Sequence, residues 1–138
     1  METYESKQKR ILKNRETVYA EMTDLRNVEK YLQNVPQEMK DKVKDMTFEE
    51  DCISFNADMV GKVEMRIIDR EMPKMVKFGF TGIPVNANLW VQFVAISEDE
   101  TRMKVTVKAD IPFMLKPMIG NKLEEGVERF ADMLAMTL

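Results

Sequence analysis

The spacing of apolar residues changes twice along the chain, and each change predicts a different kind of element. Over residues 14–35, apolar positions recur every three or four residues, which is the helical period. Asn14 is a candidate cap for a first short helix, and Thr23 with Asp24 offers a cap for a second. Pro36 lies just beyond the second apolar stripe and favours its end there. The segment therefore predicts two short helices in succession.

Beyond these helices the period falls to about two, which is typical of strands. Strands are predicted near 43–50, 52–58, 62–71, 74–81, 86–97 and 102–110, and residues 3–13 have the character of an exposed first strand. Short links with turn residues join the later strands, so antiparallel hairpins are expected. In the last strand Met103 and Val105 alternate with Lys104, so one face of the sheet is apolar and needs a cover.

The C-terminal segment 113–138 has the pattern of a helix that supplies this cover. Its apolar stripe consists of Leu115, Met118, Ile119, Leu123, Val127, Phe130 and Leu134. Pro117 belongs in the first helical turn, where its missing N–H costs little. Gly126 is unfavourable inside a helix, by about 1 kcal/mol relative to alanine. We therefore expect it to admit the close approach of a strand, a helix or a ligand.

Length and charge limit the class of protein. A chain of 138 residues is expected to form a single domain over 1–138. It carries 21 Lys and Arg against 24 Asp and Glu, a net charge of −3, so no large basic field is available for nucleic acid. The N-terminus is charged from Glu2 and lacks an apolar stretch, which favours a cytoplasmic location. The longest uncharged run, 78–97, is too polar to span a bilayer, so no integral membrane segment is expected.

Catalytic and metal-binding patterns are scarce in the sequence. The chain has no histidine and one cysteine, Cys52, which excludes nucleophilic catalysis that uses histidine and predicts a buried thiol. Gly-rich phosphate loops are also missing, so neither a metal nor any other cofactor is expected. The candidate acid–base residues are Asp58, Glu64, Tyr19, Tyr31 and Lys122. Their spacing in the sequence does not predict that any two of them lie close together.

The order of elements resembles the START-like (SRPBCC) superfamily, also called the polyketide cyclase and birch-pollen-allergen-like helix-grip fold. The resemblance covers nearly the whole chain as one START-like domain. Its most recognisable part is the helix pair, from Val18 and Tyr19 through Thr23-Asp24 to Val35-Pro36. The acidic turn and strand SEDETRMKVTV, residues 97–107, is similar to a late hairpin of the family. The family's frequent Ala-Pro after the first strand is replaced here by Lys13-Asn14.

The resemblance implies an α+β fold in which a bent antiparallel sheet of about seven strands wraps around a long C-terminal helix. It also implies a cavity between them for an apolar ligand. The candidate wall residues are Met65, Ile67, Phe78, Phe80, Trp90, Gln92, Met103, Val105, Met114, Met118 and Ile119. Methionine suits adaptable apolar walls but also fills irregular cores. Gln92 is a candidate polar group of the pocket, an outward-facing residue or a hydrogen-bonded core amide.

Three functions fit this sequence. The first is binding or carriage of a hydrophobic small molecule such as a lipid, a quinone or a polycyclic, polyketide-like compound, by a monomer or homodimer. The second is an enzyme of the polyketide cyclase, aromatase or dehydratase type, which requires a buried acid or tyrosine beside the ligand. The third is a co-chaperone-like protein-interaction module, which requires a filled core and an exposed apolar patch.

Overall fold

An antiparallel sheet of eight strands dominates the computed structural model, which describes residues 2–32, 37, 45–57 and 61–138. The strands are β1 (Glu2–Glu5), β2 (Lys9–Ile11), β3 (Thr47–Phe48), β4 (Cys52–Ala57), β5 (Gly61–Glu71), β6 (Met75–Thr81), β7 (Ala87–Ser97) and β8 (Glu100–Ala109). Their order is β1-β8-β7-β6-β5-β4-β3, and β2 also pairs with β8. Register shifts between Ile67 and Asp69 and between Ala95 and Ser97 interrupt two ladders, as bulges that bend a sheet do.

Helices α1 and α2 begin just after the residues that the sequence predicts as their N-caps. Asn14 Oδ1 accepts a hydrogen bond of 2.9 Å from Glu16 N at the start of α1 (Arg15–Met22). Asp24 Oδ1 accepts one of 3.1 Å from Arg26 N at the start of α2 (Arg26–Leu32). A 3-10 turn, η1 (Phe113–Leu115), leads into α4 (Lys116–Thr137), and Pro117 lies in its first turn as predicted.

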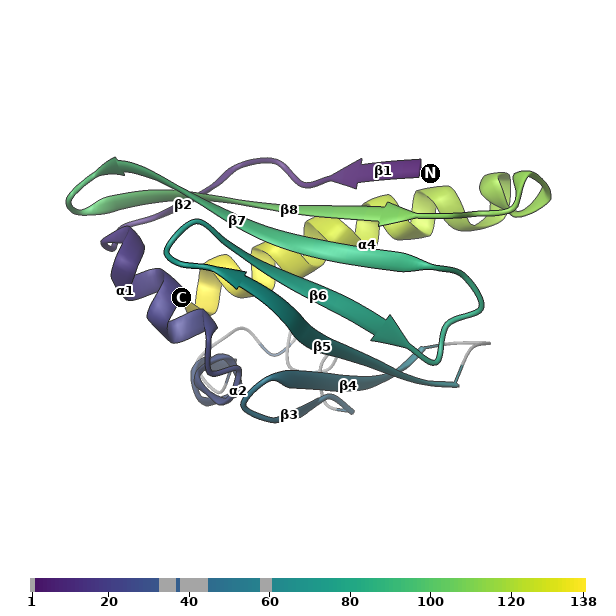
Figure 1. Cartoon of the computed structure of the whole chain (residues 1–138), viewed down its shortest axis with the longest axis horizontal. Helices are drawn as coiled ribbons and strands as arrows, with labels where there is room; N and C mark the ends of the chain where they lie inside the picture. Colours follow the sequence, from purple (N-terminus) through teal and green to yellow (C-terminus); the bar gives the residue numbers. More distant parts are fainter. Residues whose placement is uncertain (1, 33–36, 38–44, 58–60) are drawn as a thin grey trace.

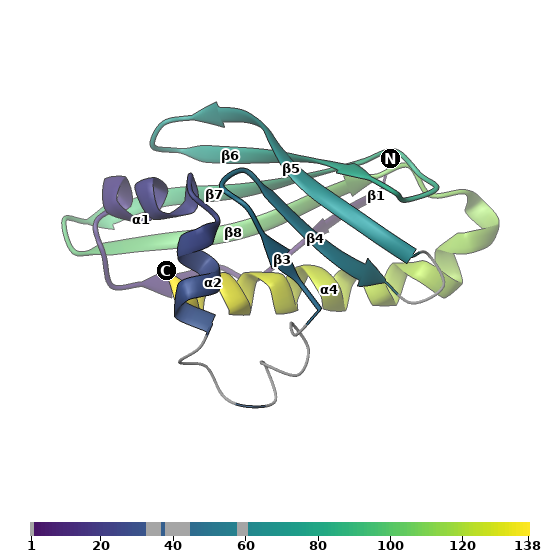
Figure 2. The ribbon, with the colours of Figure 1, turned by 90° about the horizontal axis from the view of Figure 1, so that it is seen from below.

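Helix α4 forms a layer on one face of the sheet (Figures 1 and 2). Its backbone comes close to β8, β1, β2 and α2. Helices α1 and α2 lie at the end of the molecule where the C-terminus is found, and the start of α4 projects beyond the strands at the other end. Buried residues of the sheet and of α1, α2 and α4 form one apolar cluster. The predicted α+β helix-grip architecture is therefore confirmed.

The first predicted strand, 3–13, is divided into β1 and β2 because residues 6–8 leave the regular ladder. Ser6 N donates to Val105 O at 2.8 Å, and Ser6 Oγ accepts from Val105 N at 2.9 Å. The serine side chain thus takes the place of a backbone acceptor at the break. In the predicted strand 43–50, residues 43 and 44 lie outside the described residues, and β3 covers Thr47–Phe48.

Two further expectations concern Cys52 and membrane spans. Cys52 is a buried free thiol, as predicted. Within residues 2–32, 37, 45–57 and 61–138, no helix combines the length and apolarity needed to cross a bilayer.

Candidate functional site

Burial changes along the apolar stripe of α4. In its second half, Val127, Ala131 and Leu134 are buried in the core, and Phe130 of the same stripe is half-buried. In its first half, Leu123 continues the same stripe but is only half-buried, and Leu115 of η1 is also half-buried. One face of the helix therefore passes from a closed core to a partly open apolar surface.

On β4 and β6 the inward-facing side chains show a similar change toward the same end, while Val63 of β5 and Ala109 of β8 stay buried there. On β4, Ile53 is fully buried, whereas Phe55, two residues on and on the same face, is half-buried. On β6, Phe78 is fully buried and Phe80 is half-buried. Apolar side chains of α1 and α2 join the core cluster at the far end. We call the half-buried set Phe55, Phe80, Ala87, Leu115 and Leu123 the open end.

Polar groups are found beside the open end on β1. Tyr4 pairs with Val107, whose side chain faces the core, so the Tyr4 ring lies under the sheet against α4. Its hydroxyl lies 3.4 Å from the point where a Cβ on Gly120 would stand, so the missing side chain gives it room. Lys116 Nζ lies 2.5 Å from Glu2 Oε1, and this pair lowers the pKa of Glu2 and raises that of Lys116. A phenol and an ion pair thus border the apolar surface.

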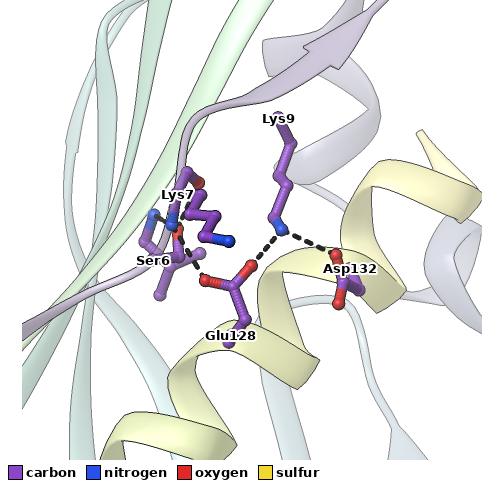
Figure 3. Close-up of polar contacts among 6 residues, drawn as sticks. Ser6, Lys7, Lys9, Glu128 and Asp132 are labelled. Atoms are coloured by element: carbon purple, nitrogen blue, oxygen red, sulfur yellow. Dashed lines mark hydrogen bonds and ion pairs between the residues drawn. The ribbon is translucent and has the colours of Figure 1, made fainter.

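The second half of α4 is anchored to the break between β1 and β2 (Figure 3). Lys9 Nζ contacts Glu128 and lies 2.8 Å from Asp132 Oδ1, and Lys7 N donates to Glu128 Oε1 at 2.9 Å. Burial alone would lower the pKa of Lys9, but hydrogen bonds to Asp132 and Glu128 outweigh it and raise that pKa. The bonds from Lys9 and the Lys7 amide lower the pKa of Glu128. These contacts hold the buried half of the helix in place.

Six of the predicted wall residues face the side of the sheet that α4 covers. Met65, Ile67, Phe78, Met103 and Val105 are buried in the core cluster, and Phe80 is half-buried against it. Their predicted inward orientation matches the structure. Only Phe80 of the six also belongs to the open end, because the other five are buried.

Trp90 and Gln92 require a correction, since both lie on the opposite face of the sheet. Leu89, Val91 and Phe93 are the buried members of β7, and alternation turns Trp90 and Gln92 outward. The Trp90 ring has Lys77 Nζ at 5.2 Å and Lys108 Nζ at 5.6 Å from its centroid. Gln92 Oε1 accepts a bond of 3.0 Å from Thr106 Oγ1. Gln92 is therefore an outward-facing, hydrogen-bonded residue rather than a pocket group.

Met114 and Met118 are also corrected, because they do not roof a cavity. Met114 is 85% exposed and Met118 is 65% exposed. Figure 1 shows that the start of α4 projects past the strands, which agrees with this exposure. The side chain of Ile119 lies outside the described residues.

The candidate acid–base residues are not brought together. Glu64 alternates with the buried Val63 and Met65, so it lies on the outer face, and Lys122 is exposed on α4. Tyr19 is buried, and burial raises the pKa of its phenol. Asp58 and the side chain of Tyr31 lie outside the described residues. In the part of the chain that the structure describes, no cluster of acidic or cysteine residues is arranged to hold a metal ion.

A separate hollow of about 400 Å³ lies at the other end of α4. It is broadly open to solvent and is lined by Arg10, Ile11, Leu12, Lys13, Ala135, Met136 and Leu138. Its two cations already have acidic partners, Glu100 for Arg10 and Glu21 for Lys13. The hollow is remote from the open end and shares none of its residues.

Comparison with known proteins gives the fold. No protein family's sequence profile matches the chain, and no curated protein matches it in sequence. A Thermobifida fusca protein solved by NMR is similar over 98% of this chain and 91% of its own, with 14% identity and a TM-score of 0.67. Norcoclaurine synthase from Thalictrum flavum is similar over 97% and 84%, with 6% identity and a TM-score of 0.66. The Aha1 dimer from Colwellia psychrerythraea is similar over 93% and 97%, with 13% identity and a TM-score of 0.52. The chain therefore has the START-like helix-grip fold that its sequence predicts.

Proposed function

We propose that the protein binds a hydrophobic small molecule at the open end, between β4, β6 and the first half of α4. The observation that carries this proposal is the change in burial along α4 and along the facing strands. Leu123 and Phe80 continue the stripes of Leu134 and Phe78, yet they remain half-buried. An apolar ligand placed there would cover these half-buried side chains.

The side chains of the open end suit a mostly apolar ligand that carries one or a few polar atoms. The open end offers aromatic and aliphatic side chains, and removal of apolar area from water contributes about 25 cal/mol per Å² before ordering costs are subtracted. The Tyr4 hydroxyl is a polar group at its border that can orient one oxygen or nitrogen of a ligand. A lipid, a quinone or a polycyclic, polyketide-like molecule has this combination.

Two turns at this end give a route for the ligand. Residues 82–86 connect β6 to β7, and residues 110–112 connect β8 to η1. Asp110 N donates to Asn86 O at 2.8 Å, so the two connections lie side by side. Small movements of the helix start would widen access without disturbing the anchored second half of α4.

The test is titration with a fluorescent hydrophobic probe, followed by displacement with a panel of lipids, quinones and polycyclic aromatics. Leu123→Trp enlarges a half-buried side chain at the open end and is expected to weaken probe binding at least about tenfold. Trp90→Ala is the matched control, since Trp90 lies on the outer face and its removal should leave the affinity unchanged. Equal loss in both variants, or in neither, contradicts the proposal.

A further inference from the structure

The start of the C-terminal helix carries large apolar side chains in solvent. Phe113 is 84% exposed, and Met114 and Met118 in the same segment are also mostly exposed. Pro112 precedes the exposed residues and Pro117 lies among them, where η1 leads into the first turn of α4. We call residues 111–118 the apolar tip. Three large apolar groups exposed this close together are unusual on a soluble protein and indicate an interaction surface.

A second uncharged segment lies beside the apolar tip. No charged residue occurs between Phe78 and Asn88, and the turn 82–86 within this run is held against Asp110 by the bond to Asn86 O. Gly82 fixes this turn, with φ of +88°. Ile83 and Val85 are half-buried beside it. Two segments far apart in the sequence therefore lie side by side, and neither 78–88 nor 111–115 carries a charge.

We propose that the apolar tip inserts into the surface of a phospholipid bilayer. The start of α4 projects beyond the ends of the strands, so the tip can enter a bilayer while the sheet stays in water (Figures 1 and 2). A protruding turn with flexible methionine side chains suits the deformable boundary between lipid headgroups and acyl chains. This inference goes beyond ligand binding at the open end and does not depend on it.

The charged residues within the apolar tip and just after it are lysines. Over residues 111–123 the only charged residues are Lys116 and Lys122, although the whole chain has a net charge of −3. Lys108 lies at the end of β8, just before the tip. Four acids lie near these lysines: Asp110 in the connection, Glu2, which pairs with Lys116, and Glu124 and Glu125, which follow Leu123. Binding is therefore expected to come mainly from apolar insertion, with a modest further gain from anionic lipid.

The first experiment is flotation of the full-length chain with vesicles of phosphatidylcholine alone or mixed equally with phosphatidylglycerol. The variant Phe113→Ser/Met114→Ser/Met118→Ser is expected to lower partitioning at least about tenfold, because it removes the inserting groups. Lys122→Glu is expected to lower partitioning about fivefold or more on the mixed vesicles only. The matched control is Leu12→Ser/Met136→Ser, which removes apolar groups 70% and 55% exposed at the other end of α4. Partitioning equal to wild type in the triple variant would overturn the proposal.

A spectroscopic readout separates insertion from other contacts. In a Trp90→Phe chain, Phe113→Trp places the only tryptophan at the apolar tip. Its emission should move to shorter wavelength when vesicles are added, and far-UV circular dichroism should confirm that the fold is unchanged. Emission that stays at the wavelength of exposed tryptophan overturns the proposal. Emission that is already shifted without vesicles, with a dimer in sedimentation, also overturns it, because a second copy of the chain would then cover the tip.

Discussion

Lys9 Nζ lies 2.8 Å from Asp132 Oδ1, which joins the start of β2 to the last third of α4. The same ammonium contacts Glu128, one helical turn earlier. Both contacts are on the half of the helix that is already buried. The helix is therefore anchored where its core is complete, and the half that lies over the open end is not held by this cluster. The first half of α4 is joined to β1 separately, by the ion pair between Lys116 and Glu2.

Glu128→Gln should lower stability by about 1 kcal/mol near neutral pH, after allowance for solvent screening of a partly exposed pair. The contacts with Lys9 and the Lys7 amide depress the Glu128 pKa, so their stabilisation is present above the ordinary carboxyl value of about 4.3 and disappears as the pH falls through the lower folded value. Urea unfolding across this acid range should show a shallower pH dependence in the variant than in wild type. Glu124→Gln, an exposed carboxylate on the same helix, is the control and should leave the slope unaltered.

Ser6→Ala should cost about 1–3 kcal/mol, although it removes a single oxygen atom. Ser6 Oγ accepts from Val105 N, and both residues are buried, so the variant leaves a backbone donor without an acceptor. Thermal unfolding measures the loss, and Ser6→Thr keeps the hydroxyl as a comparison. A stability equal to wild type in Ser6→Ala would show that water satisfies this donor.

Replacing glycine by alanine should have opposite effects at positions 82 and 126. At Gly82, with φ of +88°, an added Cβ would meet Lys62 O at 2.2 Å, so Gly82→Ala should destabilise by about 1–3 kcal/mol. At Gly126 an added Cβ would meet nothing within 4 Å, so the expected close approach of another group is wrong. Gly126→Ala should therefore stabilise the helix by about 1 kcal/mol. Paired thermal unfolding curves give both signs in one experiment.

Tyr4→Phe tests whether the phenol orients the ligand. The change keeps the ring packed against the core and removes only the hydroxyl beside Gly120. A ligand with a polar end should bind about fivefold more weakly, since one hydrogen bond of about 1 kcal/mol is lost, while a purely apolar ligand should bind as before. Equal affinities for both ligands in both proteins would remove Tyr4 from the site.

The sequence predicts the fold well because the periods of its elements are clear. The caps at Asn14 and Asp24 and the strands from residue 52 onward agree with the structure to within about two residues. The inward face of the strand 86–97 is harder to predict, since the strand has no charge and both of its faces carry apolar residues. The polar Asn88 and Gln92 were the signal that the Trp90 face is outward.

The open end could not be predicted from the sequence, because it depends on which elements reach which end of the sheet. Phe55 and Ile53 have the same alternation, and Leu123 and Leu134 share one helical stripe, yet their burial differs. The difference comes from α1 and α2, which supply buried side chains at the far end of the core only. Likewise, Tyr4 belongs to a strand that is polar on both sides, and no period identifies its inward face.

Native mass spectrometry of the protein from its own cells, compared with the denatured chain, tests most directly whether a hydrophobic molecule occupies the open end. Wild type and Trp90→Ala should both carry the same added mass, which is lost on denaturation and extracts as an apolar compound. Leu123→Trp should carry little or none of it. Bare wild-type protein that also fails to bind lipids, quinones and polycyclic aromatics, or an adduct that persists unchanged in Leu123→Trp, would contradict binding at the open end.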